Sequence, residues 1–140
     1  MATRSTITLS TEEGYKSIYC HWDGHPSNNG KILLEHYDTE DKVKELIALG
    51  SLSTLDKKTT PDEGDKHSFC HPAKNVTVAY HRDRGEGSKP SITHYEALYS
   101  VYEEGEEYNY MFEDGEWYLL NKGDGMITLK PLHHIVEDDE

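Results

Sequence analysis

Two adjacent Cys-His pairs, Cys20-His21 and Cys70-His71, stand fifty positions apart in the chain. Together they contain the ligand types of a Cys₂His₂ zinc site, and each pair has the two groups of a cysteine nucleophile and its base. Residues 15–22 alternate in polarity and predict a strand, in which neighbouring side chains point to opposite faces. Cys20 and His21 are therefore poorly placed to act together. We expect a buried structural cysteine beside a polar histidine, and we keep both pairs as weak metal candidates.

Enzymatic activity has no positive signature in this sequence. It contains no Gly-x-Ser-x-Gly elbow, phosphate loop, Gly-x-Gly-x-x-Gly or His-Glu-x-x-His motif. A small metal-dependent hydrolase stays an alternative. A structural zinc also stays one, with one ligand from each Cys-His pair and a further ligand from His25 or His67. We expect a protein that is not an enzyme and that carries no cofactor.

The arginines are few and concentrated. The chain has eleven lysines but only three arginines, and Arg82 and Arg84 lie in "YHRDRGEGSK", where a predicted strand enters a glycine-rich loop. Arginine suits bidentate recognition of phosphate or carboxylate, and glycine allows a ligand to approach the backbone closely. The plain interpretation is that both arginines form ion pairs with the acidic hairpin. The sharper one is an anion pocket in which Asp83 orients one guanidinium.

Aromatic side chains complete the pocket hypothesis. Ten tyrosines and two tryptophans are many for 140 residues, and stacking on such a ring contributes roughly 1–3 kcal/mol per base. For Trp22 and Trp117 the alternative is ordinary core packing. The residues that we predict to bind a ligand are Arg82, Arg84, Trp22, Asp23, Tyr108, Tyr110 and Arg4.

Charge and composition limit the other functions. The chain has 27 acidic and 14 basic residues, for a net charge of −13. Eleven of the acidic residues lie in residues 103–116 and 137–140, so the excess belongs to one hairpin region and one tail. Direct nucleic-acid binding over a basic face is not expected. Two cysteines and no apolar run of membrane-spanning length predict a cytoplasmic protein with reduced thiols and no membrane contact.

The elements that would position these residues can be predicted from local patterns. Residues 3–10 and 15–22 form a hairpin, residues 30–37 a helix, and residues 40–49 a second helix that Asp38 or Thr39 caps. The long segment 51–74 has no period, so it is functional, mobile or hides a short element. Residues 75–82 predict a strand with Tyr80 and Arg82 on one face. A helix then begins at Ser91 or at a Thr93-x-x-Glu96 capping box.

The strongest local signal is "EYNYMFEDGEWYLLN". Asp114-Gly115 is a favoured two-residue hairpin turn, which places Phe112 opposite Trp117 and Glu113 opposite the like-charged Glu116. A last strand, "MITLK", follows. The prediction is a single α+β domain over residues 1–136, with an antiparallel sheet built from hairpins and two or three helices packed on it. Residues 137–140 form an acidic tail.

Four stretches of the chain carry a resemblance: "MATRSTI", "YCHWDG" with the residues around it, "RDRGE" and "EYNYMFEDGEWY". Taken together they resemble a group of small accessory proteins encoded by tailed bacteriophages, over most of the chain apart from residues 51–74 and the tail. The resemblance implies expression in the cytoplasm of an infected bacterium, but it carries over no catalytic residues. Small dispensable phage proteins often act against host defence.

The leading functional expectation is a phage counter-defence protein that sequesters a small anionic, nucleotide-derived immune signal. A second expectation is an acidic inhibitor or nucleic-acid mimic, which blocks a host restriction, CRISPR or other defence enzyme. The partner is accordingly a small nucleotide-like ligand or a host defence protein. A homo-oligomer is also expected, because the chain has a thin core.

Overall fold

The computed structural model describes residues 3–123 and 126–138, and two hairpins form the centre of its sheet. The first hairpin joins β1 (Ser5–Thr11) to β2 (Gly14–Cys20) in antiparallel register, with Ile7 opposite Ile18. Both isoleucines are buried. The polarity alternation of residues 3–22 therefore predicted this hairpin correctly.

The second hairpin joins β6 (Tyr108–Glu113) to β7 (Glu116–Gly123), and β8 (Met126–Pro131) pairs antiparallel with β7. Asp114 and Gly115 have φ angles of 48° and 83°, as a turn that matches strand twist requires. Phe112 lies opposite Trp117 in the resulting register. The predicted cross-strand pairs, including the like-charged pair at the hairpin tip, are confirmed.

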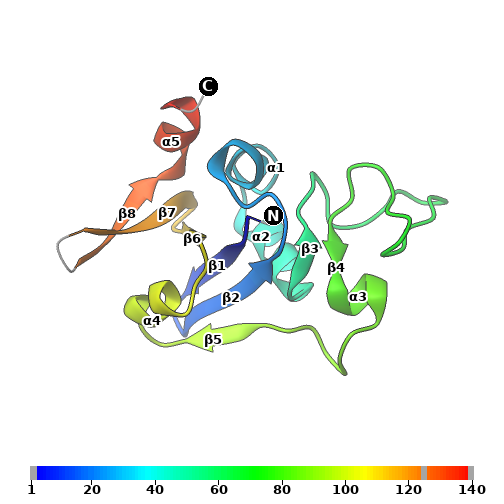
Figure 1. Ribbon diagram of the computed structural model, residues 1–140, viewed down its shortest axis with the longest axis horizontal. Helices are drawn as coiled ribbons and strands as arrows, with labels where there is room; N and C mark the ends of the chain where they lie inside the picture. The colour runs from blue at the N-terminus through cyan, green and yellow to red at the C-terminus, as the bar shows by residue number, and fades with distance from the viewer. Residues whose placement is uncertain (1–2, 124–125, 139–140) are drawn as a thin grey trace.

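The hairpins assemble into one eight-stranded sheet of order β4-β3-β2-β1-β6-β7-β8, with β5 (Thr93–Tyr95) paired to β2 (Figure 1). β3 (Leu52–Thr54) is the short element hidden in the long segment, and it pairs with β4 (Val78–Ala79). The β1–β6 and β2–β3 pairs are parallel, whereas the others are antiparallel. The predicted α+β class is confirmed, with a mixed but mostly antiparallel sheet.

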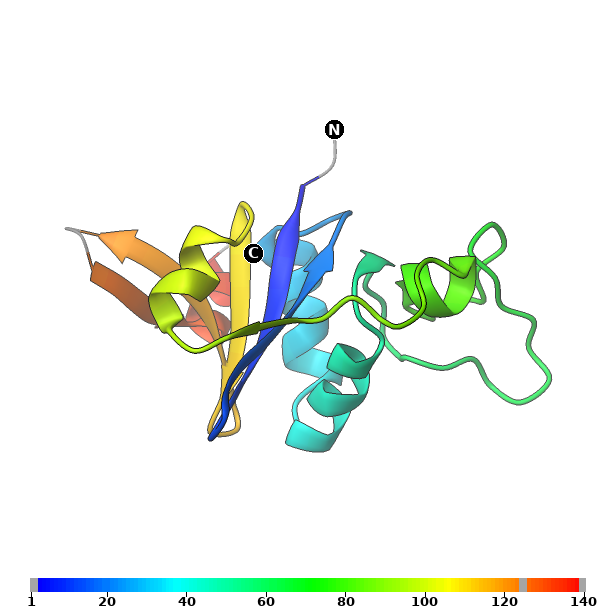
Figure 2. The ribbon, with the colours of Figure 1, turned by 90° about the horizontal axis from the view of Figure 1, so that it is seen from below.

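Three helices cover one face of this sheet: α1 (Lys31–His36), α2 (Glu40–Ala48) and α5 (Leu132–Asp138), with a π-helical turn over Pro26–Gly30 before α1. Thr39 caps α2 through its side chain, as predicted. The main core lies here, and Trp117 donates a hydrogen bond of 2.7 Å from Nε1 to the carbonyl of Tyr37. Figure 2 shows α1 and α2 on the side of the sheet opposite α4.

The opposite face carries a smaller core of Val101, Met111 and Leu120 beneath α4 (Leu98–Glu103). The predicted capping box at Thr93 is wrong, because residues 93–95 form β5 and the helix starts five residues later. Tyr95 lies opposite Tyr15 of β2. Pairing to an existing strand satisfies backbone groups that an isolated helical turn would leave free, so this tertiary contact overrides the local helix signal.

The strand predicted over residues 75–82 is shortened to two residues. α3 (Tyr80–Arg84) begins directly after β4, and the Asp83 carboxylate accepts a hydrogen bond of 2.8 Å from the Ala79 N–H at the helix start. Gly85, with φ +76°, ends the helix. Tyr80 and Arg82 therefore do not share a strand face, contrary to the prediction.

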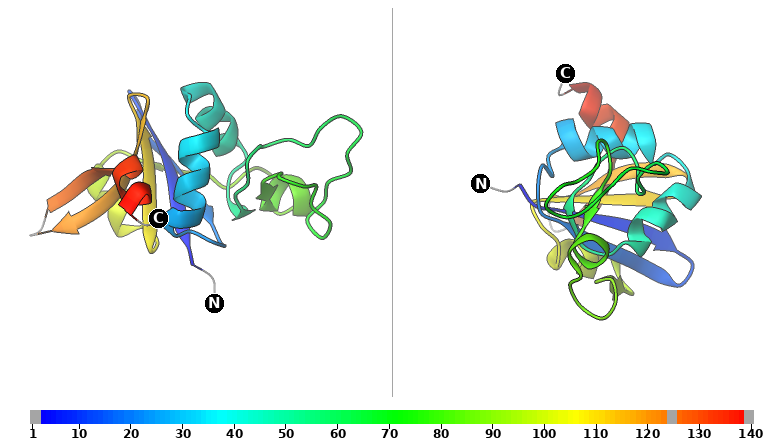
Figure 3. Two further views of the ribbon diagram at one scale, coloured as in Figure 1. Left: turned by 90° about the horizontal axis from the view of Figure 1, so that it is seen from above. Right: turned by 90° about the vertical axis from the view of Figure 1, so that its right-hand side faces the viewer.

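The two ends of the sheet differ in shape. The β7–β8 ribbon stands at one end, whereas α3 and the long segment project from the other (Figure 1, Figure 3). α5 crosses the predicted domain boundary at residue 136 and continues to Asp138; tail residues 139–140 lie outside the described residues. Within the described part of the chain, no helix has the length and apolarity needed to cross a bilayer.

Candidate functional site

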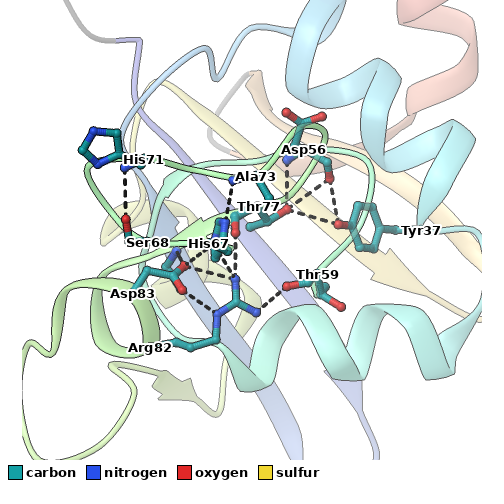
Figure 4. Close-up of polar contacts among 11 residues, drawn as sticks. Tyr37, Asp56, Thr59, His67, Ser68, His71, Ala73, Thr77, Arg82 and Asp83 are labelled. Atoms are coloured by element: carbon teal, nitrogen blue, oxygen red, sulfur yellow. Dashed lines mark hydrogen bonds and ion pairs between the residues drawn. The ribbon is translucent and has the colours of Figure 1, made fainter. Parts of the chain in front are cut away.

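The guanidinium of Arg82 lies at the centre of a polar network that holds the long segment against α3 (Figure 4). Nε and Nη2 donate to the two carboxylate oxygens of Asp83 over 2.8 and 3.0 Å. Nη2 also donates to the carbonyl of Thr77 over 2.8 Å, and Nη1 donates to the carbonyl of Thr59. Arg82 therefore connects Thr59 of the long segment and Thr77 before β4 to α3, and protein groups hold its guanidinium in place.

His67 approaches the same carboxylate from the middle of the segment. Its Nε2 lies 3.1 Å from Oδ2 of Asp83, and each of these two side chains is only 4% exposed. Its Nδ1 accepts a hydrogen bond of 2.9 Å from the N–H of Ala73. Nδ1 is therefore unprotonated, and the neutral ring donates from Nε2 to Asp83. His67 therefore holds the long segment against α3, since both of its ring nitrogens are engaged.

Burial raises the pKa of Asp83, but hydrogen bonds from Arg82, Ala79 and His67 outweigh it, so that the pKa lies below its ordinary value. Asp83 thus stays ionised under neutral conditions and keeps Arg82 fixed in place. The prediction that Asp83 orients one guanidinium agrees with this geometry. The oriented group, however, donates to protein carbonyls and to Asp83 itself.

A second part of the network ties the segment to α1. The hydroxyl of Tyr37 donates to the carbonyl of Asp56 over 2.8 Å and lies 3.3 Å from Oγ1 of Thr77. The N–H of Asp56 in turn donates to Oγ1 of Thr77 over 2.9 Å. Burial raises the pKa of Tyr37 to about 12, which keeps the phenol protonated as a donor. Figure 4 shows both parts of the network meeting at Thr77.

Arg84 is placed quite differently from Arg82. Its side chain is 53% exposed, and its Nε lies 3.9 Å from Oε1 of Glu86. The guanidinium sits 5.0 Å from the centre of the Phe69 ring, which packs 5.7 Å from the ring of Tyr80. The long segment thus supplies an aromatic support for a cation at the surface.

Tyr80 and Glu86 also border a pocket of about 250 Å³ between the start of β3 and the glycine-rich loop. We call it the glycine-loop cleft, and it is lined by Ser51, Tyr80, His81, Glu86, Gly87, Lys89 and Ser91. Backbone hydrogen bonds of 3.1 Å from Ser51 to Ser91 and from Tyr80 to Ser51 hold its walls together. The cleft is therefore part of the folded structure.

The chemistry of the glycine-loop cleft suits an anion next to a flat ring. Lys89 is exposed and forms no ion pair among the described residues. Gly87, with φ +74°, opens the loop backbone toward a ligand. His81 uses Nδ1 to contact the carbonyl of Glu86 over 2.9 Å, which leaves Nε2 for other partners. Tyr80 supplies the ring.

The other predicted ligand residues lie elsewhere. Tyr110 is fully buried, and its hydroxyl donates to the carbonyl of Gly24 over 2.5 Å. Tyr108 packs against the main core, whereas Trp22 is 42% exposed and meets the ring of His21 edge-on. Asp23 borders a different pocket beside α1, and Arg4 is exposed near the chain start. None of the five lines the glycine-loop cleft.

Sequence reasoning missed Tyr80 as the ring of this cleft and Phe69 as the ring that supports Arg84 beside it. Phe69 lies in a segment without periodicity, and Tyr80 was assigned to a strand face that does not form. One signal was present in the sequence, since "SFCH" puts a large ring into an otherwise polar loop. A ring in such a loop must find a partner or remain exposed.

The cysteines of the two Cys-His pairs differ in exposure. Cys20 belongs to the main core, where burial raises its pKa to about 11, whereas Cys70 is exposed. His21 points its Nδ1 to the hydroxyl of Tyr19 at 2.6 Å. Within the described residues, no three or more His, Cys, Asp or Glu side chains are grouped so that they could hold a metal ion. Cys20 is thus placed as the buried structural cysteine that we expected.

Acidic side chains from separate segments converge at one end of the sheet. Because β1 and β6 run parallel, the turn at Glu12 lies beside the hairpin tip at Glu113 and Asp114. Glu40 of α2 borders the same hollow, whose volume is about 450 Å³, and no basic residue lines it. Parallel pairing thus enlarges the acidic surface beyond the single hairpin seen in the sequence.

Comparison with known proteins identifies no relative, because no family model, curated protein or solved structure matches this chain. We therefore infer function from the chain's own residues.

Proposed function

We propose that this protein is a non-enzymatic, phage-encoded counter-defence protein, which sequesters a small anionic, nucleotide-derived immune signal in the cytoplasm of the infected bacterium. The resemblance of its sequence to phage accessory proteins supports the origin and the location. The observation that carries the binding step is the glycine-loop cleft, which Lys89 and the ring of Tyr80 line. Arg84 stands next to it, over the Phe69 ring that packs on Tyr80.

The cleft indicates how such a ligand binds. Pockets that enclose whole drug-sized ligands have volumes of roughly 300–1,000 Å³, so a pocket of about 250 Å³ holds one phosphorylated sugar or one base. The base stacks on Tyr80, while Lys89 and the hydroxyls of Ser51 and Ser91 bind phosphate. A longer ligand leaves the cleft over Phe69.

Arg84 is suited to bind a second phosphate there. Its contact with Glu86 is long and exposed, and pairs of this kind contribute about 0–1 kcal/mol. A phosphate can therefore replace the carboxylate at little cost. The stacking of the guanidinium on Phe69 already restricts its side chain, which lowers the entropy lost on binding.

Isothermal titration calorimetry with cyclic dinucleotides and with ADP-ribose derivatives tests this function. We expect binding to at least one probe, and a loss of affinity of about tenfold or more in Lys89→Ala and in Arg84→Ala, as for charge-assisted hydrogen bonds of roughly 1.5–3 kcal/mol. Lys74→Ala is the matched control, because Lys74 is an exposed lysine outside the cleft. Absence of heat with every probe, or equal binding by all variants, would refute the proposal.

A second candidate function follows from the acidic end of the sheet. Glu12, Glu40, Glu113 and Asp114 face the same hollow, and with Glu116 at the hairpin tip they form a negatively charged surface. Such a surface complements the basic groove of an enzyme that binds nucleic acid. In this alternative, the protein inhibits a host restriction or CRISPR nuclease by occupying that groove.

DNA cleavage by a purified restriction endonuclease and by a Cas nuclease tests this alternative. Inhibition should weaken steeply as salt rises, because exposed charges are screened. Glu113→Gln combined with Glu116→Gln should reduce it further, whereas the control pair Glu63→Gln with Asp65→Asn, exposed in the long segment, should not. Inhibition that is insensitive to salt and to the hairpin substitutions would exclude this mode of action.

A further inference from the structure

The strands at the two ends of the main strand order, β4 and β8, differ in length. On one side, β4 has only two residues and leads directly into α3. On the other, β8 runs for six residues, and Met126 at its start is 70% exposed. Long open edge strands tend to pair with another strand, and most proteins shorten or cover them. β4 is protected by shortness, as is the three-residue β5 that pairs with β2, whereas β8 is not.

The register shows which backbone groups of β8 are free. The tight turn of the β6–β7 hairpin makes Glu113 and Glu116 a hydrogen-bonded pair. Hydrogen-bonded and non-hydrogen-bonded pairs alternate along an antiparallel hairpin, so Met111 and Tyr118 also form a hydrogen-bonded pair. Tyr118 therefore directs its backbone N–H and C=O toward β6. Pro131 lies opposite Tyr118 in β8, in a pair that is not hydrogen-bonded, so its missing N–H costs no bond to β7. By the same alternation, every second residue of β8 directs its N–H and C=O outward.

These outward residues are Ile127 and Leu129. Among the described residues, no backbone hydrogen bond uses their outer groups. Their side chains are half-buried and pack against the smaller core on the α4 face, whereas Thr128 and Lys130 are exposed on the other face. The edge thus offers the backbone N–H and C=O groups of Ile127 and Leu129, and the side chains of these two residues are apolar.

This edge is self-complementary. A two-fold axis beside Thr128 places Ile127 of one copy opposite Leu129 of the other, so that both hydrogen-bonded pairs form and apolar side chains meet. Lys130 then faces Met126, and no like charges are opposed. β8 carries no acidic residue in a chain whose net charge is −13, so its pairing has less repulsion to overcome than pairing at the acidic end.

We propose that β8 is the interface of a homodimer, in which the edges of two chains pair antiparallel about Thr128 and join two sheets into one. The smaller cores of the two copies become continuous through Ile127 and Leu129. The glycine-loop clefts then lie at the two far ends of the joined sheet, since β8 and β3 are at opposite ends of the strand order. Dimerisation is thus independent of ligand binding.

Sedimentation equilibrium between micromolar and millimolar chain concentration measures the dimer. We expect a species of twice the 16.0 kDa chain mass and a rise of at least about tenfold in the dissociation constant for Thr128→Lys, which places two like charges directly opposite each other. Ala48→Lys adds the same charge at an exposed position of α2 and should leave the constant unchanged. A chain that stays monomeric throughout, or a dimer that Thr128→Lys does not weaken, would overturn the proposal.

Cross-linking tests the register itself. Residue 128 forms a non-hydrogen-bonded pair with its own copy, and Cα atoms in such pairs are about 4.5 Å apart, within disulfide range. In a Cys70→Ser background, which removes the exposed native thiol, Thr128→Cys should oxidise to a covalent dimer. Lys130→Cys, displaced from the axis, should cross-link far more slowly. Equal cross-linking at both positions would refute the register.

Discussion

Arg82→Ala removes the group on which the folded state of the long segment most depends. Asp83 loses two charge-assisted hydrogen bonds while it remains 4% exposed, and the carbonyl of Thr77 loses a donor. Removal of one partner from a buried ion pair costs about 3–5 kcal/mol. Arg82 is 28% exposed and Asp83 keeps its bond to His67, so we expect the lower end, about 3 kcal/mol.

Urea unfolding, followed by circular dichroism, measures this loss. With a slope of roughly 2 kcal/mol per molar urea for a domain of this size, the midpoint should fall by about 1.5 M. Arg84→Ala is the matched control and should cost less than about 1 kcal/mol, because its ion pair is long and exposed. Limited proteolysis of Arg82→Ala should cleave within residues 55–77 first. If Arg82→Ala is no less stable than Arg84→Ala, the anchoring role of Arg82 is wrong.

Three further predictions concern the backbone, the thiols and the pH dependence. Gly50→Ala should cost more than about 1 kcal/mol beyond Gly64→Ala in urea unfolding, because both glycines have positive φ but only at Gly50 would the new methyl meet backbone, at 2.6 Å. Labelling with a chromogenic disulfide at pH 8 should modify Cys70 at once and Cys20 only after unfolding, since burial raises the pKa of Cys20 to about 11; rapid labelling of both would contradict the structure. The pKa of Asp83 lies below its ordinary 3.8, so its carboxylate stabilises the fold above that pH and the contribution is lost as the pH falls further. The difference in unfolding free energy between wild type and Asp83→Asn should therefore shrink on acidification, and a constant difference would show that Asp83 is not linked to folding.

Local signals sufficed where neighbouring residues define the structure. Asp114-Gly115 specifies its hairpin because the turn needs two positive φ angles. Thr39 caps α2 because its side chain reaches an N–H three residues ahead. The failures involve contacts with distant residues: Thr93 entered a strand because β2 lay beside it, and Tyr80 began a helix because the Asp83 carboxylate and the short β4 ended the strand there.

The candidate site shows the same division. The sequence drew attention to the glycine-rich loop and to Arg84, since charged and flexible residues are recognisable by type. It could not distinguish the roles of Arg84 and Arg82, which stand only two positions apart. The separation depends on the carbonyls of Thr59 and Thr77, which the folded long segment brings to one side of α3.

By itself, then, the sequence determined the α+β class, both hairpins, the first two helices and the uneven distribution of negative charge, because each depends on periodicity, turn chemistry or residue type within a short window. Only the tertiary structure decided which arginine anchors the long segment, which tyrosine borders the cleft, and that two acidic turns meet at one end of the sheet. Those features depend on parallel strand pairing and on a loop that closes over itself. Such contacts join residues far apart in the chain, and they leave no periodic mark in the sequence.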